Sequence, residues 1–174
     1  MACLSAALVV LFALPASSQQ PWQGLRIEPE CNSSPYKERE YKKLYNQVRN
    51  PHLLDGLFAR DGYLGRLESA GTVRSCDVTI NHVVATSEAH DSGGCKWRAS
   101  TRRAFAVDPA NLTLACRSTN SSKGKRDAAE WSRFPEDQHC WYARTVIRVK
   151  RFWRLSVDPE EKRALATMLS TCPP

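Results

Sequence analysis

The stretch VTINHVVA, residues 78–85, is rich in β-branched side chains, which is typical of a strand. A second strand is predicted over LTLAC, residues 112–116, and the pattern becomes helical after Asn120. Each of these three segments carries polar side chains that an order of strand, strand and helix can bring together. They are His82, Asn111, Asn120 and Lys123. The middle of the chain therefore predicts a small β element with a polar site.

Helical periodicity predicts helices on both sides of this element. The last helix has the clearest start signal, because Asp158 can serve as its N-cap and Pro159 suits its first turn. The preceding helix has candidate core residues at Trp141, Tyr142, Val146, Val149 and Trp153. This preceding helix is predicted over residues 138–153. The other predicted helices cover residues 36–48, 53–67 and 97–107. Together with the strands, they indicate an α+β fold.

The first residues of the chain are typical of a secretory signal peptide. An apolar run from Leu4 to Leu14 is followed by Pro15 and small residues before the chain turns polar. We expect residues 1–19 to be removed and the mature protein to be secreted and extracellular. No other segment approaches the ~20 apolar residues that a transmembrane helix needs. We expect a monomer without a membrane segment.

The cysteines that remain after this cleavage are even in number, which indicates disulfides in a secreted chain. The candidates are Cys31, Cys76, Cys95, Cys116, Cys140 and Cys172. None of them stands at the close spacing of a structural zinc clip. Their pairing is not fixed by the sequence, although we expect Cys140 to pair with Cys172, because they lie on and after the last two helices.

The chain has 174 residues, enough for one compact core and too few for two ordinary domains. We divide the mature part into an N-terminal helical region, residues 20–75, and a main domain, residues 76–174. The net charge of +7 belongs wholly to the mature protein and attracts polyanions such as nucleic acid, an acidic glycan or an anionic membrane. The charge alone is equally compatible with a protein that is merely kept soluble.

Four motifs of the chain occur together in one family. They are NHVVATSEAHDSGG from residue 81, AVDPANLTLA from residue 106, NSSKGKRDAAEW from residue 120 and QHCWYA from residue 138. In this combination, residues 77–131 and the segment after them resemble the HNH nuclease domain of GmrSD-type restriction enzymes. The resemblance implies a ββα-metal (HNH-like) nuclease core with additional helices, stabilised by disulfides.

The resemblance also implies roles for particular residues. His82 would be the general base that activates water, and Asn111 would hold the adjacent loop and orient His82. Lys123 would lie near the scissile phosphate. The metal ligands implied are Asn120 and Asn81, for a divalent ion such as Mg²⁺ or Mn²⁺. The implied contacts to nucleic acid, DNA or RNA, are Lys125 and Arg126.

The main departure from the family is Asn81, which stands where the family has a metal-binding aspartate. A neutral amide oxygen is a poorer ligand for a hard cation than a carboxylate. Asp77 or Asp91 could supply the missing carboxylate. Two further departures are Ala85 in place of proline and His90 in place of tryptophan, which puts a titratable group in the region of the site.

Several of these residues also have ordinary explanations. Asn32, Asn111 and Asn120 all begin glycosylation sequons, and a glycan on Asn120 would block the proposed ligand. His139 is better explained as a surface or capping residue than as a catalytic one. Three tryptophans suit the core better than a base-stacking platform. They are Trp131, Trp141 and Trp153.

Two functions follow from this reading. The first is a secreted, metal-dependent endonuclease that hydrolyses phosphodiester bonds with little sequence specificity, because the chain has no recognisable base-reading motif. The alternative is a nuclease-derived protein that has lost catalysis and acts as a secreted nucleic-acid-binding or interaction module. Asn81 favours the alternative. The residues that favour the enzyme are His82, Asn111, Asn120 and Lys123.

Overall fold

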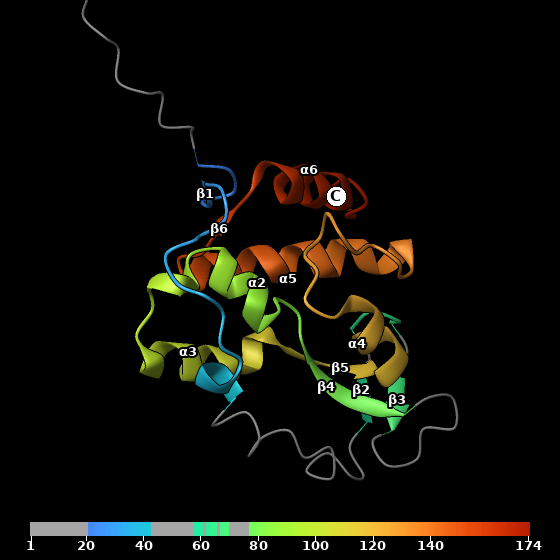
Figure 1. Cartoon of the computed structure of the whole chain (residues 1–174). Helices are drawn as coiled ribbons and strands as arrows, with labels where there is room; N and C mark the ends of the chain where they lie inside the picture. The colour runs from blue at the N-terminus through green and yellow to red at the C-terminus, as the bar shows by residue number, and fades with distance from the viewer. Residues whose placement is uncertain (1–20, 43–57, 61, 66, 70–76) are drawn as a thin grey trace, which may run out of the picture.

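The computed structural model describes residues 21–42, 58–60, 62–65, 67–69 and 77–174 of the chain. Its longest helix, α5, runs across the middle of the molecule, with α6 on one side and β4, β5 and α4 on the other (Figure 1). The elements from residue 77 onward are β4 Val78–His82, α2 Thr86–Asp91, η2 Gly94–Lys96, α3 Ala99–Ala106, η3 Pro109–Asn111, β5 Leu112–Cys116, α4 Arg117–Lys123, η4 Glu136–Gln138, α5 His139–Phe152, β6 Ser156–Val157 and α6 Pro159–Leu169. Helices and strands both contribute, which confirms the predicted α+β class.

The unit formed by β4, β5 and α4 is the predicted sequence of strand, strand and helix. The two strands are antiparallel, with Val78 opposite Cys116 and His82 opposite Leu112. β4 stops at His82, earlier than predicted, because the amides of the next residues bond to Asn111 instead of a strand partner. α4 begins at Arg117, directly after β5 rather than after Asn120. The β4–β5–α4 unit therefore forms at the predicted place, with shifted boundaries.

The part of the chain before β4 contains three short strands among its described residues. They are β1 Arg26–Ile27, β2 Phe58–Arg60 and β3 Leu67–Ser69. β1 pairs in parallel with β6, and β2 pairs antiparallel with β3. The helix predicted over residues 53–67 is wrong where the structure describes it, because β2 and the start of β3 fall inside that range. Glycines account for the turn between them. Gly65 has a φ of +65°, and a Cβ on Gly62 would lie 2.2 Å from a ring carbon of Trp141.

Three of the remaining helices, α3, α5 and α6, follow the prediction closely, whereas α2 was not predicted. α3 and α5 lie within the ranges 97–107 and 138–153. Tyr142, Val146 and Val149 of α5 are buried in the core as expected. α6 has the predicted cap, in which the Asp158 carboxylate accepts from the backbone amides of Glu160 and Glu161 at 2.7 and 2.8 Å. The helix predicted over residues 36–48 is helical at residues 39–42, residues 36–38 precede the helix, and residues 43–48 lie outside the described residues.

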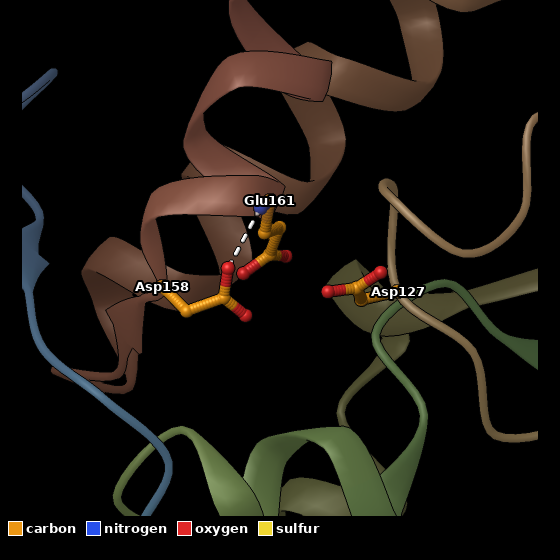
Figure 2. A group of neighbouring side chains, drawn as sticks. All are labelled: Asp127, Asp158 and Glu161. Carbon is orange, nitrogen blue, oxygen red and sulfur yellow. Dashed lines mark hydrogen bonds between the residues drawn. The ribbon is translucent and has the colours of Figure 1, made fainter.

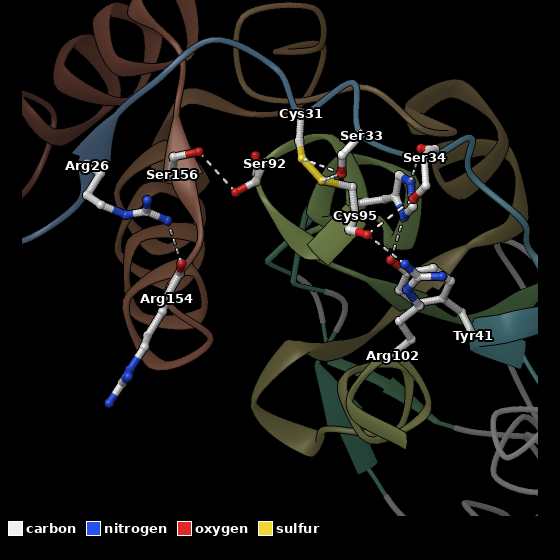
Figure 3. Close-up of a disulfide and its surroundings, with 11 residues drawn as sticks. Arg26, Cys31, Ser33, Ser34, Tyr41, Ser92, Cys95, Arg102, Arg154 and Ser156 are labelled. Atoms are coloured by element: carbon white, nitrogen blue, oxygen red, sulfur yellow. Dashed lines mark hydrogen bonds between the residues drawn. A yellow bond between two sulfur atoms is a disulfide. The ribbon is translucent and has the colours of Figure 1, made fainter. Parts of the chain in front are cut away.

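Two disulfides join described cysteines. Cys140 pairs with Cys172, as predicted, and ties the start of α5 to the end of α6. Cys31 pairs with Cys95 and fixes the N-terminal segment to η2 (Figure 3). Cys116 is disulfide-bonded as well. The predicted signal peptide lies outside the described residues. Within those residues, no helix combines the length and the apolar character that crossing a membrane requires.

Candidate functional site

The β4–β5–α4 unit forms one side of an open pocket of about 580 Å³. The other side comes from the N-terminal segment that the Cys31–Cys95 disulfide holds in place. The lining residues are Tyr36, Glu38, Lys42, Val78, Thr79, Ile80, Asn81, His82, Ala85, Thr86, Ser87, Arg117, Asn120, Gly124 and Lys125. Three of the predicted catalytic and metal-binding residues, His82, Asn81 and Asn120, therefore meet in one pocket.

Asn111 lies behind this pocket and holds the end of β4. Its side chain is 0% exposed. Its Oδ1 accepts from the amide of Val84 at 2.8 Å, and its Nδ2 donates to the carbonyl of Val84 at 3.0 Å. Its backbone carbonyl accepts from the amide of Val83 at 2.9 Å. This clamp fixes the two residues that follow His82, so it limits how the backbone of His82 can move.

The His82 ring is held by a carbonyl from another element. Nε2 lies 2.8 Å from the carbonyl oxygen of Ala106 at the end of α3 and must be the donor, since a carbonyl can only accept. In the neutral ring, Nδ1 is then the basic nitrogen. Burial lowers the pKa of His82 from 6.5 to about 4, and the nearby charge of Lys123 adds to this effect. His82 is thus neutral at neutral pH.

The side-chain amides of Asn81 and Asn120 are in direct contact in the pocket. Asn81 Nδ2 donates to Asn120 Oδ1, and Asn81 Oδ1 accepts from the hydroxyl of Tyr63 at 2.9 Å. Tyr63 is buried in an aromatic cluster with Trp131 and Trp141, so its hydroxyl is fixed in position. Sequence reasoning missed Tyr63, because it assigned residues 53–67 to a helix. The neighbouring Gly62 and Gly65, which disfavour a helix, were the available signal.

These two amides fit a divalent cation of the Mg²⁺ type, though weakly. A half-turn of the Asn81 amide exchanges Oδ1 and Nδ2, and Tyr63 can then accept where it now donates. Both amide oxygens would then face the same point. Oxygen ligands suit a hard cation, but these two are neutral. Neither aspartate considered from the sequence lines the pocket. Asp77 is paired with Arg117, and Asp91 faces a different crevice.

Lys123 does not reach the pocket, contrary to the prediction. Its side chain is 0% exposed, and its Nζ makes no hydrogen bond within the described chain. Burial lowers its pKa to about 8, while the carboxylates of Glu88, Asp127 and Glu161 oppose the shift. Such counter-charges stabilise an ammonium group in the interior, where it cannot contact a phosphate in solvent. Lys123 therefore belongs to the interior.

The interior carboxylates form a cluster under α6. Asp127, Asp158 and Glu161 point toward one another, with one oxygen of each within 4.8 Å of the others (Figure 2). Lys150 of α5, also fully buried, donates to Glu161, and to Glu88 at 2.7 Å. We call this group the buried ion cluster. Its members are Lys123, Lys150, Glu88, Asp127, Asp158 and Glu161. The described structure supplies its positive charge through these two lysines.

The rim of the pocket carries exposed cations. Lys125 and Arg117 line the pocket and are exposed, and Lys42 lines it from the N-terminal side. Arg126 is exposed but does not line the pocket, because its guanidinium donates to the carbonyl of Ser122. Of the two predicted nucleic-acid contacts, the structure therefore places Lys125 at the pocket and Arg126 beside it.

The three sequons differ sharply in accessibility. Asn32 is exposed. Asn111 is buried with both ends of its amide bonded to Val84, so the folded protein leaves no space for a glycan there. The amide of Asn120 is directed into the pocket toward Asn81. Only the first of these sequons accepts a glycan without disturbing the site.

The other histidines and the tryptophans considered in the sequence analysis contribute to packing. His90 is buried and bonds to the carbonyl of Ser34 and to Tyr41, so it anchors the N-terminal segment. His139 begins α5 and packs against Phe134. The three tryptophans pack in or against the core, as expected. They are Trp131, Trp141 and Trp153.

His82 and Asn81 on β4 and Asn120 on α4 thus bring a neutral imidazole and two amides together in one pocket. The chain belongs to the family described as GmrSD restriction endonucleases, C-terminal domain, whose model matches residues 27–168. The match reaches further toward the N-terminus than the sequence motifs, and it includes the segment that forms the second wall of the pocket. Family membership supports a nuclease-related function acting on nucleic acid.

One curated relative is an uncharacterized secreted protein of Arthroderma benhamiae. It is 28% identical to this chain over 174 aligned residues, which cover 90% of this chain and 85% of the relative. No solved structure matches the chain. The disulfides described above are consistent with an extracellular location like that of this relative.

Proposed function

We propose that the protein is a secreted, metal-dependent endonuclease that hydrolyses phosphodiester bonds with little sequence specificity. The observation that carries this proposal is the convergence of His82, Asn81 and Asn120 on one pocket with a basic rim. Each of them comes from a different position of the β4–β5–α4 unit, and together they supply a base and oxygen ligands.

His82 is the general base in this proposal. Its Nε2 is engaged by the carbonyl of Ala106, so Nδ1 takes the proton of the attacking water. Its lowered pKa keeps the ring neutral at physiological pH, which is the form that can accept a proton. Asn111 acts as a positioning residue, since its clamp on Val84 fixes the backbone next to His82.

The metal site of the proposal consists of the side-chain oxygens of Asn120 and Asn81. A divalent ion bound there would offset the negative charge that builds up on the phosphorus oxygens. With two neutral protein ligands, affinity for the ion depends on the substrate phosphate and on water. We therefore expect weak binding of metal in the absence of nucleic acid.

The rim residues hold the substrate. Lys125 can contact phosphates, which are common to all sequences, and Lys42 and Arg117 can do so by exchanging their surface ion pairs with Glu38 and Asp77. Lys125 takes the phosphate-contacting place that the sequence assigned to Lys123. Contacts to the backbone without base contacts account for low sequence specificity, and they leave DNA and RNA as substrates of the same site.

The test is plasmid nicking and RNA degradation by the oxidised mature protein, with Mg²⁺, Mn²⁺ or EDTA. We expect cleavage with metal only, and a loss of about a hundredfold or more in His82→Ala. A matched pair is Asn120→Ala and Ser121→Ala, because Ser121 is the exposed neighbour on the same helix. Full activity of His82→Ala with intact folding would remove the proposed base.

A second candidate is a nuclease-derived module that binds nucleic acid without cleaving it. The hydrogen bond from Asn81 to Asn120 favours it, because it directs an N–H group at the presumed ligand oxygen. Asn81→Asp separates the two candidates. In the enzyme, this change adds a carboxylate and should strengthen the response to metal, whereas the binding module should remain inactive in every metal.

A further inference from the structure

The segment RVKRFWR, residues 148–154, is not used by the pocket described above. It lies in a longer stretch between Asp137 and Asp158 that contains no aspartate or glutamate. Lys150 of this stretch is buried and paired with carboxylates of the ion cluster, so it is not part of the exposed basic surface. The exposed side of α5 is therefore basic without acidic residues of its own.

These cations line a second hollow, a groove of about 530 Å³ between α5, the end of α6 and the N-terminal turn. The lining residues are Gln23, Arg144, Ile147, Arg148, Arg151, Phe152 and Leu169. None of these is among the lining residues of the pocket around His82. The lining includes no carboxylate. We call this hollow the α5 groove.

The arginines of the α5 groove are among those that form no ion pair within the described residues, and these three share one face of a helix. Arg26, Arg102, Arg117 and Arg163 each form an ion pair with a carboxylate. Arg144, Arg148 and Arg151 are exposed, and no ion pair of theirs occurs among the described residues. Their spacing of four and three residues places them on one face of α5, about one helical turn apart. This is a row of unneutralised guanidinium groups.

An aromatic ring stands at the end of this row. Phe152 is 75% exposed and is the single exposed large hydrophobic residue of the described chain. A positive groove with an exposed aromatic side chain is the combination that binds single-stranded nucleic acid, since the cations follow the phosphates and the ring stacks on an unpaired base. A membrane-binding helix needs a broad exposed apolar face instead, and Ile147 in this groove is buried.

We propose that the α5 groove is a second binding site for nucleic acid, selective for single strands, in which Arg144, Arg148 and Arg151 contact phosphates and Phe152 stacks on a base. The choice of ligand rests on the proposed nuclease function. The groove holds a strand apart from the pocket, so it raises the affinity for long substrates without taking part in the chemistry.

The experiment measures binding of a fluorescently labelled single-stranded oligonucleotide to the oxidised protein in EDTA, by fluorescence anisotropy, over a range of salt concentrations. We compare wild type, Arg144→Ala/Arg148→Ala, Phe152→Ala and Arg133→Ala. Arg133 is the matched control, because it is an exposed arginine that lines neither hollow. Circular dichroism checks that each variant is folded.

We expect the double arginine variant to bind roughly tenfold more weakly. The slope of log Kd against the logarithm of the salt concentration should also be smaller by about 1.4, since two phosphate contacts are lost. Phe152→Ala should weaken binding of the single strand by about fivefold or more and binding of a duplex much less. Arg133→Ala should bind like wild type. Wild-type affinity in both groove variants would overturn the proposal. So would unchanged oligonucleotide binding together with lost binding to anionic vesicles, which would mark a membrane surface.

Failure of the α5 groove is distinguishable from failure of the proposed nuclease. The binding assay contains no metal and does not depend on cleavage. Absence of metal-dependent cleavage by wild type, with groove-dependent binding intact, would remove the enzyme and retain the groove. Metal-dependent cleavage by wild type, with binding unchanged in the groove variants, would remove the groove and retain the enzyme.

Discussion

Asn120 and Lys123 lie one helical turn apart on α4, yet they belong to opposite environments. Asn120 lines an open pocket together with His82 and Asn81, and the charged residues of the lining are Glu38, Lys42, Arg117 and Lys125. Lys123 is buried among Glu88, Asp127 and Glu161. One motif, NSSKGKRD, thus provides a residue for the pocket and residues for the interior. Substitutions on the two sides should separate loss of activity from loss of stability.

The largest expected effect lies in the buried ion cluster. Lys150→Ala removes the cation that bonds to Glu88 and Glu161 and leaves Lys123 as the remaining lysine of the buried ion cluster, which should cost about 3–5 kcal/mol of folding free energy. Urea unfolding measures this cost. The exposed Lys125→Ala is the control and should change stability by less than about 0.5 kcal/mol while it weakens cleavage. Equal stability of the two variants would contradict the distinction between interior and pocket.

The next effect is a dependence of stability on pH. Burial raises the pKa of Glu161 from 4.5 to about 8. The folded state then holds this proton more tightly than the unfolded chain, so the contribution is complete below pH 4.5 and is lost as pH rises through 8. Between pH 6.5 and 8, the free energy of unfolding should fall in wild type and stay flatter in Glu161→Gln.

This window isolates Glu161 from two groups of opposite sign. His82, with its pKa lowered to about 4, changes protonation between folded and unfolded states only between pH 4 and 6.5. Lys123, with its pKa lowered from 10.5 to about 8, does so only above pH 8. Parallel curves for wild type and Glu161→Gln between pH 6.5 and 8 would show that Glu161 is not the group responsible.

A smaller effect tests the support behind the pocket. Tyr63→Phe removes the hydroxyl that bonds to Asn81 Oδ1 and keeps the ring in its aromatic cluster. We expect a loss of about 1 kcal/mol in stability and a several-fold loss of cleavage, because the Asn81 amide is no longer fixed. Tyr41→Phe is the matched control, since its buried hydroxyl bonds to His90 instead. It should lose similar stability and retain activity. A similar loss of activity in both would make Tyr63 a structural residue only.

The smallest expected effect is an absence of change with pH. Because the pKa of His82 is lowered to about 4, the neutral ring persists as pH falls from 7 to 5. kcat/KM for a labelled oligonucleotide should stay constant over this interval. An ordinary histidine would lose roughly thirtyfold by pH 5. A fall centred near pH 6.5 would show that burial does not act on the catalytic base as proposed.

The parts of the fold that could be predicted have local causes. β-branched residues mark β4 and β5, and the Asp158–Pro159 pair marks the start of α6. His82 and Asn120 were singled out because their positions fit the order of strand, strand and helix, and Asn81 was named from the family resemblance. The role predicted for Asn111, holding the loop after His82, stays a prediction, and its contacts with Val84 depend on the fold.

The parts that could not be predicted depend on contacts between distant segments. Tyr63 reaches Asn81 only because Gly62 allows a close approach to Trp141. Lys123 turns inward among the carboxylates of Glu88, Asp127 and Glu161, and the first and last of these are brought to α4 only by the fold. Neither relation leaves a periodic pattern in the sequence. The family match from residue 27 likewise reflects a pocket wall that the motifs do not contain.

The pairing of β1 with β6 has a consequence for the order of folding. Arg26 bonds to the backbone of Arg154, 128 residues away, and Ile27 is paired with Val157. Closing so long a loop is slow, because its entropy is lost before its contacts form. The β1–β6 pairing therefore forms late and anchors the start of the N-terminal segment, so refolding protein should regain cleavage activity later than it regains helical structure.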